Sequence, residues 1–545
     1  MKSIFLYGYF LLLPFVLRAQ ADCPFYKTYI ERGEAELKKG DKADFKTVIE
    51  AFSNAMIHCP AKADEARSKI VKAFDAINAL KIRAEKDKNT AIRARKEADS
   101  AKVVAQRRAT ETENAKTETE TALNEVNSAR QKAQDVLDKI YFYKGKFGLA
   151  YDGDKKKYGF IDKYLNIKID FKYEEALPFN QMGLAKVKRF GNYYLIDTNG
   201  TEYKLATDIL KLQLESGITA LDLSDRNVEE IDPLVFQHSQ LKVLLLNGNQ
   251  LKQIPEGIKF LVNLLYLNLS QNKIEQLENL DSLLNLVYFN CELNRIIALG
   301  GLDNLKSLQT FDISSNQIQK LEGLDSLKSL QTFNISLNQI QKLEGLDNLK
   351  SLQTFNISLN QIQKLEGLDS LKSLQTFNIS LNQIQKLEGL DNLKSLQTFN
   401  ISLNQIQKLE GLDNLKSLQA FGILGNYVCK LEGLDSLKSL QNFNISSNQI
   451  QKLEGLEHLK NIKNLSIGRN PLSVADINPR LKTMTNIEEL SLNNLGLTIL
   501  PDVIFSLKNL KKLDLGNLGD KNQNNFSKPE QEKIKKLLPN CEITF

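Results

Sequence analysis

Residues that could perform catalysis are few and scattered in this chain. The three histidines, His58, His238 and His458, fall in unrelated regions. The sequence has no Cys-x-x-Cys pair, no phosphate-cradling glycine loop and no cluster with metal-ligand spacing. One acidic group stands out, formed by Asp222, Asp225, Glu229, Glu230 and Asp232. A solvated acidic cap accounts for it better than a catalytic pair, so we expect no enzyme, no metal and no cofactor.

Asparagine is the polar residue with the most regular spacing, and it recurs with a period of 22 residues. In one copy Leu330, Phe333 and Ile335 are spaced as one face of a short strand, and Asn338 follows where the strand ends. Its amide can both donate to and accept from backbone groups of adjacent turns. Stacked copies should therefore build a buried polar ladder. The ladder comprises Asn249, Asn272, Asn294, Asn316, Asn338, Asn360, Asn382, Asn404, Asn426, Asn448 and Asn470.

The element that positions these residues is a repeat of the form LxxLxLxxN, with about 14 units starting from Ile218. Residues 323–366 recur unchanged as 367–410, which indicates internal duplication. One unit cannot bury its apolar face alone, whereas stacked units share a continuous core. The pattern resembles the leucine-rich repeat. The length and the return Leu343-Glu344-Gly345-Leu346 resemble its short class, found in bacterial internalins and a protein-phosphatase regulator.

That resemblance implies an α/β solenoid with a concave parallel sheet, short 3₁₀ turns on the convex side, and binding through concave strand residues. Side chains between the buried ones face the concave side. In the identical units these are Thr332, Asn334, Ser336, Thr354, Asn356, Ser358, Thr376, Asn378, Ser380, Thr398, Asn400 and Ser402, with Leu337, Leu359, Leu381 and Leu403 beside them. Aromatic residues favour hot spots, so Tyr266 and Tyr288 are the expected anchors for a protein, with Glu292 nearby. The alternative is that identical copies merely inherited a solvated strand face.

The first 21 residues have the features of a signal peptide, with Lys2, an apolar stretch from Ile4 to Leu17, and Ala19-Gln20-Ala21 as the cleavage site. The alternative is a membrane anchor, but the stretch is shorter than the ~18–20 residues that span a bilayer. No later apolar run is long enough to span a membrane. We therefore expect an extracytoplasmic protein: secreted, periplasmic or at the cell surface.

Residues 22–79 are expected to form a helical hairpin, in which Gly33, Phe52, Ala55 and Pro60 resemble a tetratricopeptide unit. In an antiparallel pair Cys23 and Cys59 would be neighbours, and an oxidising compartment would allow a disulfide between them. Residues 80–143 contain a long alanine-rich helix over 80–141, either a coiled coil that dimerises or a lone charged spacer.

Residues 144–205 change to aromatic β sequence. Tyr158-Gly159-Phe160-Ile161-Asp162 recurs 35 residues later as Tyr193-Tyr194-Leu195-Ile196-Asp197. The segment resembles the WG β-repeat of bacterial extracytoplasmic proteins, although tyrosines stand in place of tryptophan. The resemblance implies short hairpins. The leucine-rich units occupy 206–527, and residues 528–545 should close the array with a helix and a strand.

These features predict an exported, non-catalytic scaffold whose concave face binds a protein or a polysaccharide. The net charge of +6 is small for 545 residues and does not predict nucleic-acid binding. Two alternatives remain at this point: a structural or adhesive cell-envelope protein that dimerises through residues 80–141, and a regulatory subunit of an envelope enzyme.

Overall fold

The chain forms two compact units, Met1–Leu205 and Ala206–Phe545, in a computed structural model. The structure describes residues 4–7, 26–39, 142–143, 145–517, 519 and 522–545, together with isolated positions between 47 and 90. The predicted long helix over 80–141, apart from two such positions, and both Cys23 and Cys59 lie outside the described residues. No helix in the described parts of the chain combines the length and the apolar composition needed to cross a membrane.

The first unit contains helix α1 (Tyr26–Leu37) and two antiparallel sheets. One sheet has the order β1-β2-β3-β4, and the other pairs β5, β6, β7 and β8 in sequence. The strand bounds are β1 Ile4–Tyr7, β2 Gly148–Asp152, β3 Lys157–Ile161, β4 Ile167–Tyr173, β5 Glu175–Ala176, β6 Ala185–Arg189, β7 Asn192–Ile196 and β8 Glu202–Ala206. Strand β1 lies inside the segment that the sequence assigns to a signal peptide, and it pairs with β2.

Each of the two copies of the aromatic motif in this unit ends in a turn, and the two turns are of the same kind. After β3, the Asp162 carboxylate accepts hydrogen bonds from the backbone N–H groups of Tyr164 and Asn166 at 2.9 and 3.0 Å. After β7, Asp197 accepts from Asn199 and Thr201, both at 2.9 Å. A short side chain that bonds to backbone two and four residues ahead fixes a tight turn, so each motif ends one strand of a hairpin.

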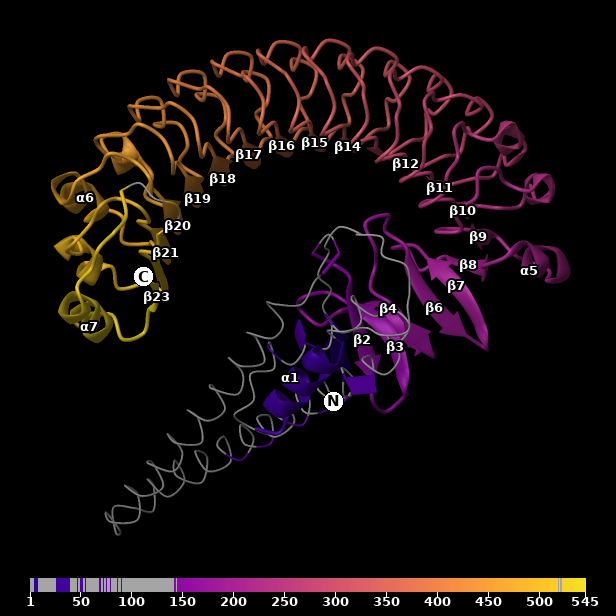
Figure 1. Cartoon of the computed structure of the whole chain (residues 1–545), viewed down its shortest axis with the longest axis horizontal. Helices are drawn as coiled ribbons and strands as arrows, with labels where there is room; N and C mark the ends of the chain where they lie inside the picture. Colours follow the sequence, from indigo (N-terminus) through magenta and orange to yellow (C-terminus); the bar gives the residue numbers. More distant parts are fainter. Residues whose placement is uncertain are drawn as a thin grey trace, which may run out of the picture. The chain divides into compact units, whose positions relative to one another are not determined.

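The second unit is a parallel-sheet solenoid, which confirms the leucine-rich-repeat fold expected from the period. Successive strands pair in parallel and in register, for example Phe333 opposite Phe355. Figure 1 shows the strands lining the inner side of this unit's arc and the turns forming its outer side. The strand bounds are β9 Ala220–Asp222, β10 Val243–Leu245, β11 Tyr266–Asn268, β12 Tyr288–Asn290, β13 Thr310–Asp312, β14 Thr332–Asn334, β15 Thr354–Asn356, β16 Thr376–Asn378, β17 Thr398–Asn400, β18 Ala420–Gly422, β19 Asn442–Asn444, β20 Asn464–Ser466, β21 Glu489–Ser491, β22 Lys512–Asp514 and β23 Glu542–Thr544.

Phenylalanine forms the spine of the solenoid core. From Phe289 to Phe443 the same strand position carries a buried ring in each of eight successive units. Adjacent rings stack with centroids 5.4–5.6 Å apart and nearly parallel planes. Aromatic stacking adds stabilisation beyond simple burial, and it holds each strand in register with the next.

The return path differs between the ends and the middle of the array. Short 3₁₀ helices occur at η3 Pro233–Gln237, η4 Glu256–Phe260, η5 Leu456–His458 and η6 Asp502–Ser506, while the units between Leu277 and Leu453 return by simple turns. In these units a glycine makes the turn, except in the first, where Asn279 adopts the left-handed backbone. Gly345 has φ 98°, and a Cβ there would lie 2.5 Å from the Leu321 carbonyl oxygen, so no other residue fits without strain.

Both ends of the solenoid are covered. Helix α5 (Ile209–Leu214) precedes β9 and buries Leu212 in the common core. At the other end α7 (Lys528–Leu537) buries Ile534, and β23 pairs with β22. A further helix, α6 (Val474–Leu481), lies in the return path between β20 and β21. Covering the terminal units removes exposed core and a bare strand edge.

Candidate functional site

The inner sheet surface of β14 to β17 presents identical residues in register. In each of these strands the phenylalanine is buried, whereas the threonine before it and the asparagine after it are at least partly exposed. Thr332 stands opposite Thr354, and Asn334 opposite Asn356. We call this surface, with the serines and leucines that follow each strand, the concave face. It carries no ionisable side chain across four units.

The asparagines of the concave face hold a fixed orientation. Asn356 Oδ1 accepts hydrogen bonds from the Ser358 backbone N–H at 3.2 Å and from Ser358 Oγ at 2.8 Å. Because a backbone N–H can only donate, the atom facing it must be the amide oxygen. The amide nitrogen is therefore turned away from Ser358. The same arrangement occurs at Asn334, Asn378 and, through the backbone bond alone, Asn400.

The serines of the predicted face are less accessible to a binding partner than the sequence suggests. Ser336, Ser358, Ser380 and Ser402 are all buried. In the first three units the hydroxyl is used by the neighbouring asparagine. Their role is to fix the turn that follows the strand, so threonine and asparagine carry the accessible polar groups.

A row of exposed leucines borders these polar groups. Leu337, Leu359, Leu381 and Leu403 are between 39% and 50% exposed. Each has a left-handed backbone, with φ between 54° and 57°. Non-glycine residues in this region carry strain of order 1 kcal/mol. The repeat position is left-handed in other units too, at Gly248, Ser315 and Gly425 among others. The conformation therefore belongs to the repeat, and a leucine there adds backbone strain and exposed apolar surface. We call these four residues the leucine row.

Lysine–glutamate ion pairs lie off the sheet in the same units. Lys342 Nζ lies 3.0 Å from Glu344 Oε1, and the equivalent lysines and glutamates repeat the pair in the neighbouring units. These side chains are strongly exposed. Exposed ion pairs add little stability, and here they neutralise the flank while leaving the concave face uncharged.

Tyr266 and Tyr288 stack on adjacent strands with centroids 6.2 Å apart. Tyr266 is half-buried, but Tyr288 is only 5% exposed. Tyr266 is therefore the more accessible of the two expected anchors.

Glu292 follows β12 and stands next to Asp312 of β13. Burial, with a smaller contribution from the Asp312 charge, raises the pKa of Glu292 to about 7. Burial also raises the pKa of Asp312, against hydrogen bonds from Ser314 and from Asn334 Nδ2 at 2.9 Å. The two units just before the concave face therefore hold two desolvated carboxyl groups, and that of Glu292 titrates near neutral pH.

The asparagines at the strand exits form a continuous hydrogen-bonded ladder. Asn360 Nδ2 donates to the carbonyl oxygens of Ile335, Ile357 and Ser358 at 3.1–3.2 Å. Its Oδ1 accepts from the Ile340 N–H at 2.9 Å. All eleven side chains from Asn249 to Asn470 are buried. Their role in the structure is to join successive backbones.

The ladder ends in a residue that the repeat pattern does not reveal. The unit that starts at Leu510 has leucine where the other units carry asparagine, and Asn524 takes the place of that asparagine from the loop after β22. Asn524 Oδ1 accepts from Leu495 and Leu497 N–H, and Nδ2 donates to the Leu492 and Leu515 carbonyls at 2.9 and 3.0 Å.

A second asparagine set was also missed by the sequence reasoning, and it lies just before the strands. Each amide nitrogen donates to a backbone carbonyl of the preceding unit at 2.8–3.1 Å. The members are Asn263, Asn285, Asn461, Asn486 and Asn509. The duplicated central units carry serine at this position. An asparagine directly before a repeat start, present only in flanking units, was the available signal.

The described residues hold no group of three or more His, Cys, Asp or Glu side chains arranged for a metal ion. His458 Nε2 lies 3.0 Å from Asp435 Oδ1, and both side chains are exposed. Cys291 is a free, fully buried thiol in the core, and burial raises its pKa well above the usual range.

Comparisons with known proteins agree with this geometry. Family models described as leucine-rich repeats match residues 216–274 and 306–348. The solenoid of this chain has the leucine-rich-repeat fold. No curated protein sequence matches it.

Two solved structures resemble this chain over most of their own length. An internalin from Listeria monocytogenes is 26% identical, with a TM-score of 0.52, over 59% of this chain and 91% of the internalin chain. A leucine-rich-repeat protein from Leptospira interrogans is also 26% identical, with a TM-score of 0.51, over 63% of this chain and all of the other.

Proposed function

We propose that this protein is a non-catalytic scaffold that binds a partner protein on the concave face of β14 to β17. The observation that carries the proposal is the leucine row. Four large apolar side chains are held exposed, in register and in a strained backbone conformation. Contiguous exposed apolar groups on a soluble surface mark interaction sites, and solenoids commonly bind on their concave surfaces.

The polar part of the face complements the leucines. The oxygen of Asn356 is occupied by Ser358, so the amide offers its nitrogen as a donor. The equivalent amides of Asn378 and Asn400 do the same one and two strands away. A partner with apolar side chains and outward carbonyl or carboxylate oxygens matches this combination.

Export is part of the proposal. The apolar stretch from Ile4 to Leu17, followed by Ala19-Gln20-Ala21, supports processing by a signal peptidase. The protein would then meet its partner outside the cytoplasm, and the absence of catalytic motifs in the sequence supports a binding role there. Dimerisation through residues 80–141 would add avidity by placing two such faces on one assembly.

The experiment is a quantitative pull-down from envelope material with the full chain. In the test variant all four residues of the leucine row are changed to asparagine, which tolerates left-handed backbone. The matched control changes Lys342, Lys364, Lys386 and Lys408 to asparagine, in the same units but off the sheet. We expect saturable retention of a partner by wild type and control, reduced about tenfold or more in the test variant, because several apolar contacts are lost together. Equal retention by all three would refute the proposal.

A further inference from the structure

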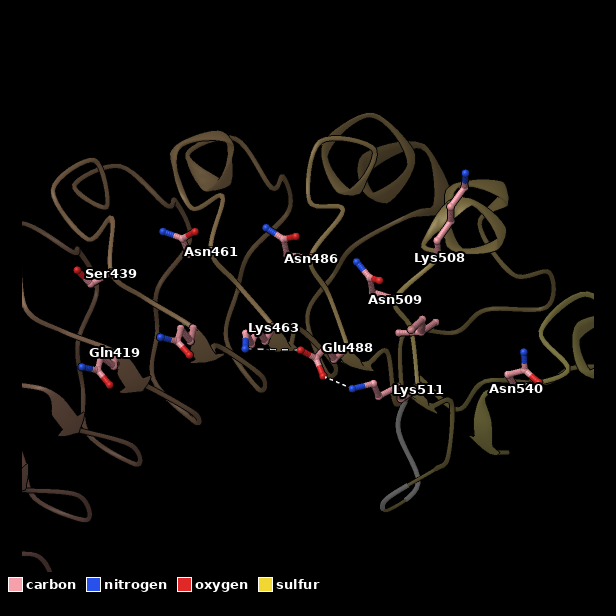
Figure 2. Close-up of a pocket in the computed structure, with 12 residues that line it drawn as sticks. Gln419, Ser439, Asn461, Lys463, Asn486, Glu488, Lys508, Asn509, Lys511 and Asn540 are labelled. Atoms are coloured by element: carbon pink, nitrogen blue, oxygen red, sulfur yellow. Dashed lines mark hydrogen bonds and ion pairs between the residues drawn. The ribbon is translucent and has the colours of Figure 1, made fainter. Parts of the chain in front are cut away.

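A polar hollow lies beside the C-terminal units, away from the leucine row. It has a volume of about 850 Å³ and is lined by residues that lie just before the strands β18 to β23. Figure 2 shows its side chains in two rows, with Ser439, Asn461, Asn486 and Asn509 in one and Gln419, Lys463, Glu488 and Lys511 in the other. The volume is within the range of small-ligand sites.

The asparagine row presents hydrogen-bond acceptors. Asn461, Asn486 and Asn509 each donate Nδ2 to a backbone carbonyl of the preceding unit, at 2.8, 2.9 and 3.0 Å. A carbonyl oxygen can only accept, so these bonds fix the orientation of each amide. In Figure 2 the nitrogens of Asn461 and Asn486 point back along the array and their oxygens point forward. Three amide oxygens are thus held at successive units by the protein's own backbone.

The second row presents charge. Glu488 is shared by two lysines, with Oε1 3.7 Å from Lys463 Nζ and Oε2 2.6 Å from Lys511 Nζ. Lys508 also lines the hollow. Three lysines against one glutamate leave an excess of two positive charges. In the duplicated units the equivalent position, just before the strand, carries only glutamine, as in Gln353. The alternation of lysine and glutamate at this position is therefore specific to the diverged C-terminal units.

The lining selects among ligand classes. Leu510 is its only apolar residue and it has no aromatic residue. Protein hot spots depend on aromatic and other large anchors, and single-stranded nucleic acid needs aromatic stacking platforms. A ligand rich in hydroxyl groups can donate to the asparagine oxygens and accept from glutamine and lysine. Carboxylates on the same ligand would form ion pairs with the lysines that carry the excess positive charge.

We propose that this hollow binds an acidic oligosaccharide, a chain of uronic acid units. Hydroxyl groups of the sugar donate to Asn461, Asn486 and Asn509, and a sugar carboxylate binds between Lys463 and Lys511. Glu488 competes with that carboxylate for the two lysines and so limits the affinity. The hollow shares no residue with the concave face, and the two sites can fail separately.

The test is calorimetric titration of the full chain with tetragalacturonate. Removing one charge-assisted contact in Lys511→Ala should weaken binding about three- to tenfold. Glu488→Gln should tighten it, because both lysines are released, and a purely structural role would not produce that sign. Gln353→Ala is the matched control, at the same repeat position in a duplicated unit, and should leave the affinity unchanged. Neutral cellotetraose should bind more weakly than tetragalacturonate, and added salt should weaken tetragalacturonate binding.

Three outcomes would overturn the proposal. The first is that tetragalacturonate does not bind. The second is that it binds equally to wild type, Lys511→Ala and Glu488→Gln. The third is that a tetraglutamate peptide binds as tightly and responds to the same variants, which would make the site one for acidic polypeptide. Changing the leucine row to asparagine should not alter any of these titrations.

Discussion

Replacing Asn360 by alanine should strongly destabilise the solenoid. The side chain makes one bond as an acceptor, from the Ile340 N–H at 2.9 Å, and three as a donor, to carbonyl oxygens of Ile335, Ile357 and Ser358. These groups are buried, so water cannot replace the missing partner at once. The variant therefore loses the side-chain hydrogen bonds that join the units starting at Leu330 and Leu352.

The magnitude follows from the groups left without a partner. One buried N–H that loses its acceptor costs about 1–3 kcal/mol, and the small cavity left by the amide adds to this. The affected carbonyls have second lone pairs and lose less. We therefore expect Asn360→Ala to lower the free energy of unfolding by about 2–4 kcal/mol.

The assay is urea denaturation of the full chain, followed by far-ultraviolet circular dichroism. Asn348→Ala is the matched control, because it makes the same change in the preceding unit at a half-buried side chain whose hydrogen bond, at 3.0 Å, goes to the exposed Asp325. It should cost less than about 1 kcal/mol. If both variants unfold at the same urea concentration as wild type, the ladder does not stabilise the array as argued.

Three further predictions concern the turn, the acidic pair and the thiols. Gly345→Ala should lower the free energy of unfolding by about 1–3 kcal/mol in the same assay, because the backbone is left-handed there and the Cβ would meet a carbonyl oxygen at 2.5 Å. The pKa of Glu292 is raised to about 7 in the folded protein. Its contribution to the free energy of unfolding is therefore greatest below the ordinary pKa of 4.5 and is lost as the pH rises through 7. Between pH 4.5 and 8 wild type should therefore lose stability relative to Glu292→Gln, and parallel pH profiles would contradict this. Iodoacetamide should modify exposed Cys429 in the native protein and buried Cys291 only after unfolding, as peptide mass spectrometry would show.

The sequence predicts the solenoid because its period and its apolar pattern are strictly regular. Phe333 and Ile335 alternate with polar residues, which predicts a strand. The same alternation returns every 22 residues, which predicts that successive units stack on one another. The ladder role of Asn338 is equally clear, because an amide that follows the strand in nearly every unit can bond to the backbones of adjacent units.

The details of the concave face depend on contacts that the pattern does not contain. Ser358 is buried and bonded to Asn356 Oδ1, and Tyr288 is buried and stacked on Tyr266. The left-handed backbone of the leucine row could have been inferred, because Gly425 occupies the same position in a related unit.

The residue that ends the asparagine ladder could not be inferred. Asn524 completes the ladder from a loop that is out of phase with the repeat. Its register depends on how that loop folds back over the last units, and no local sequence signal distinguishes it from neighbouring asparagines.

The central claim is that a partner protein contacts the leucine row on the concave face. The most direct measurement is photo-crosslinking from a benzophenone amino acid placed at Leu359, compared with the same probe at Lys364, which is also exposed in that unit but lies off the sheet. We predict that the probe at Leu359 crosslinks to one partner polypeptide in a saturable manner and that the probe at Lys364 does not. Crosslinking to the same polypeptide from Lys364 alone, or equally from both positions, would contradict the account.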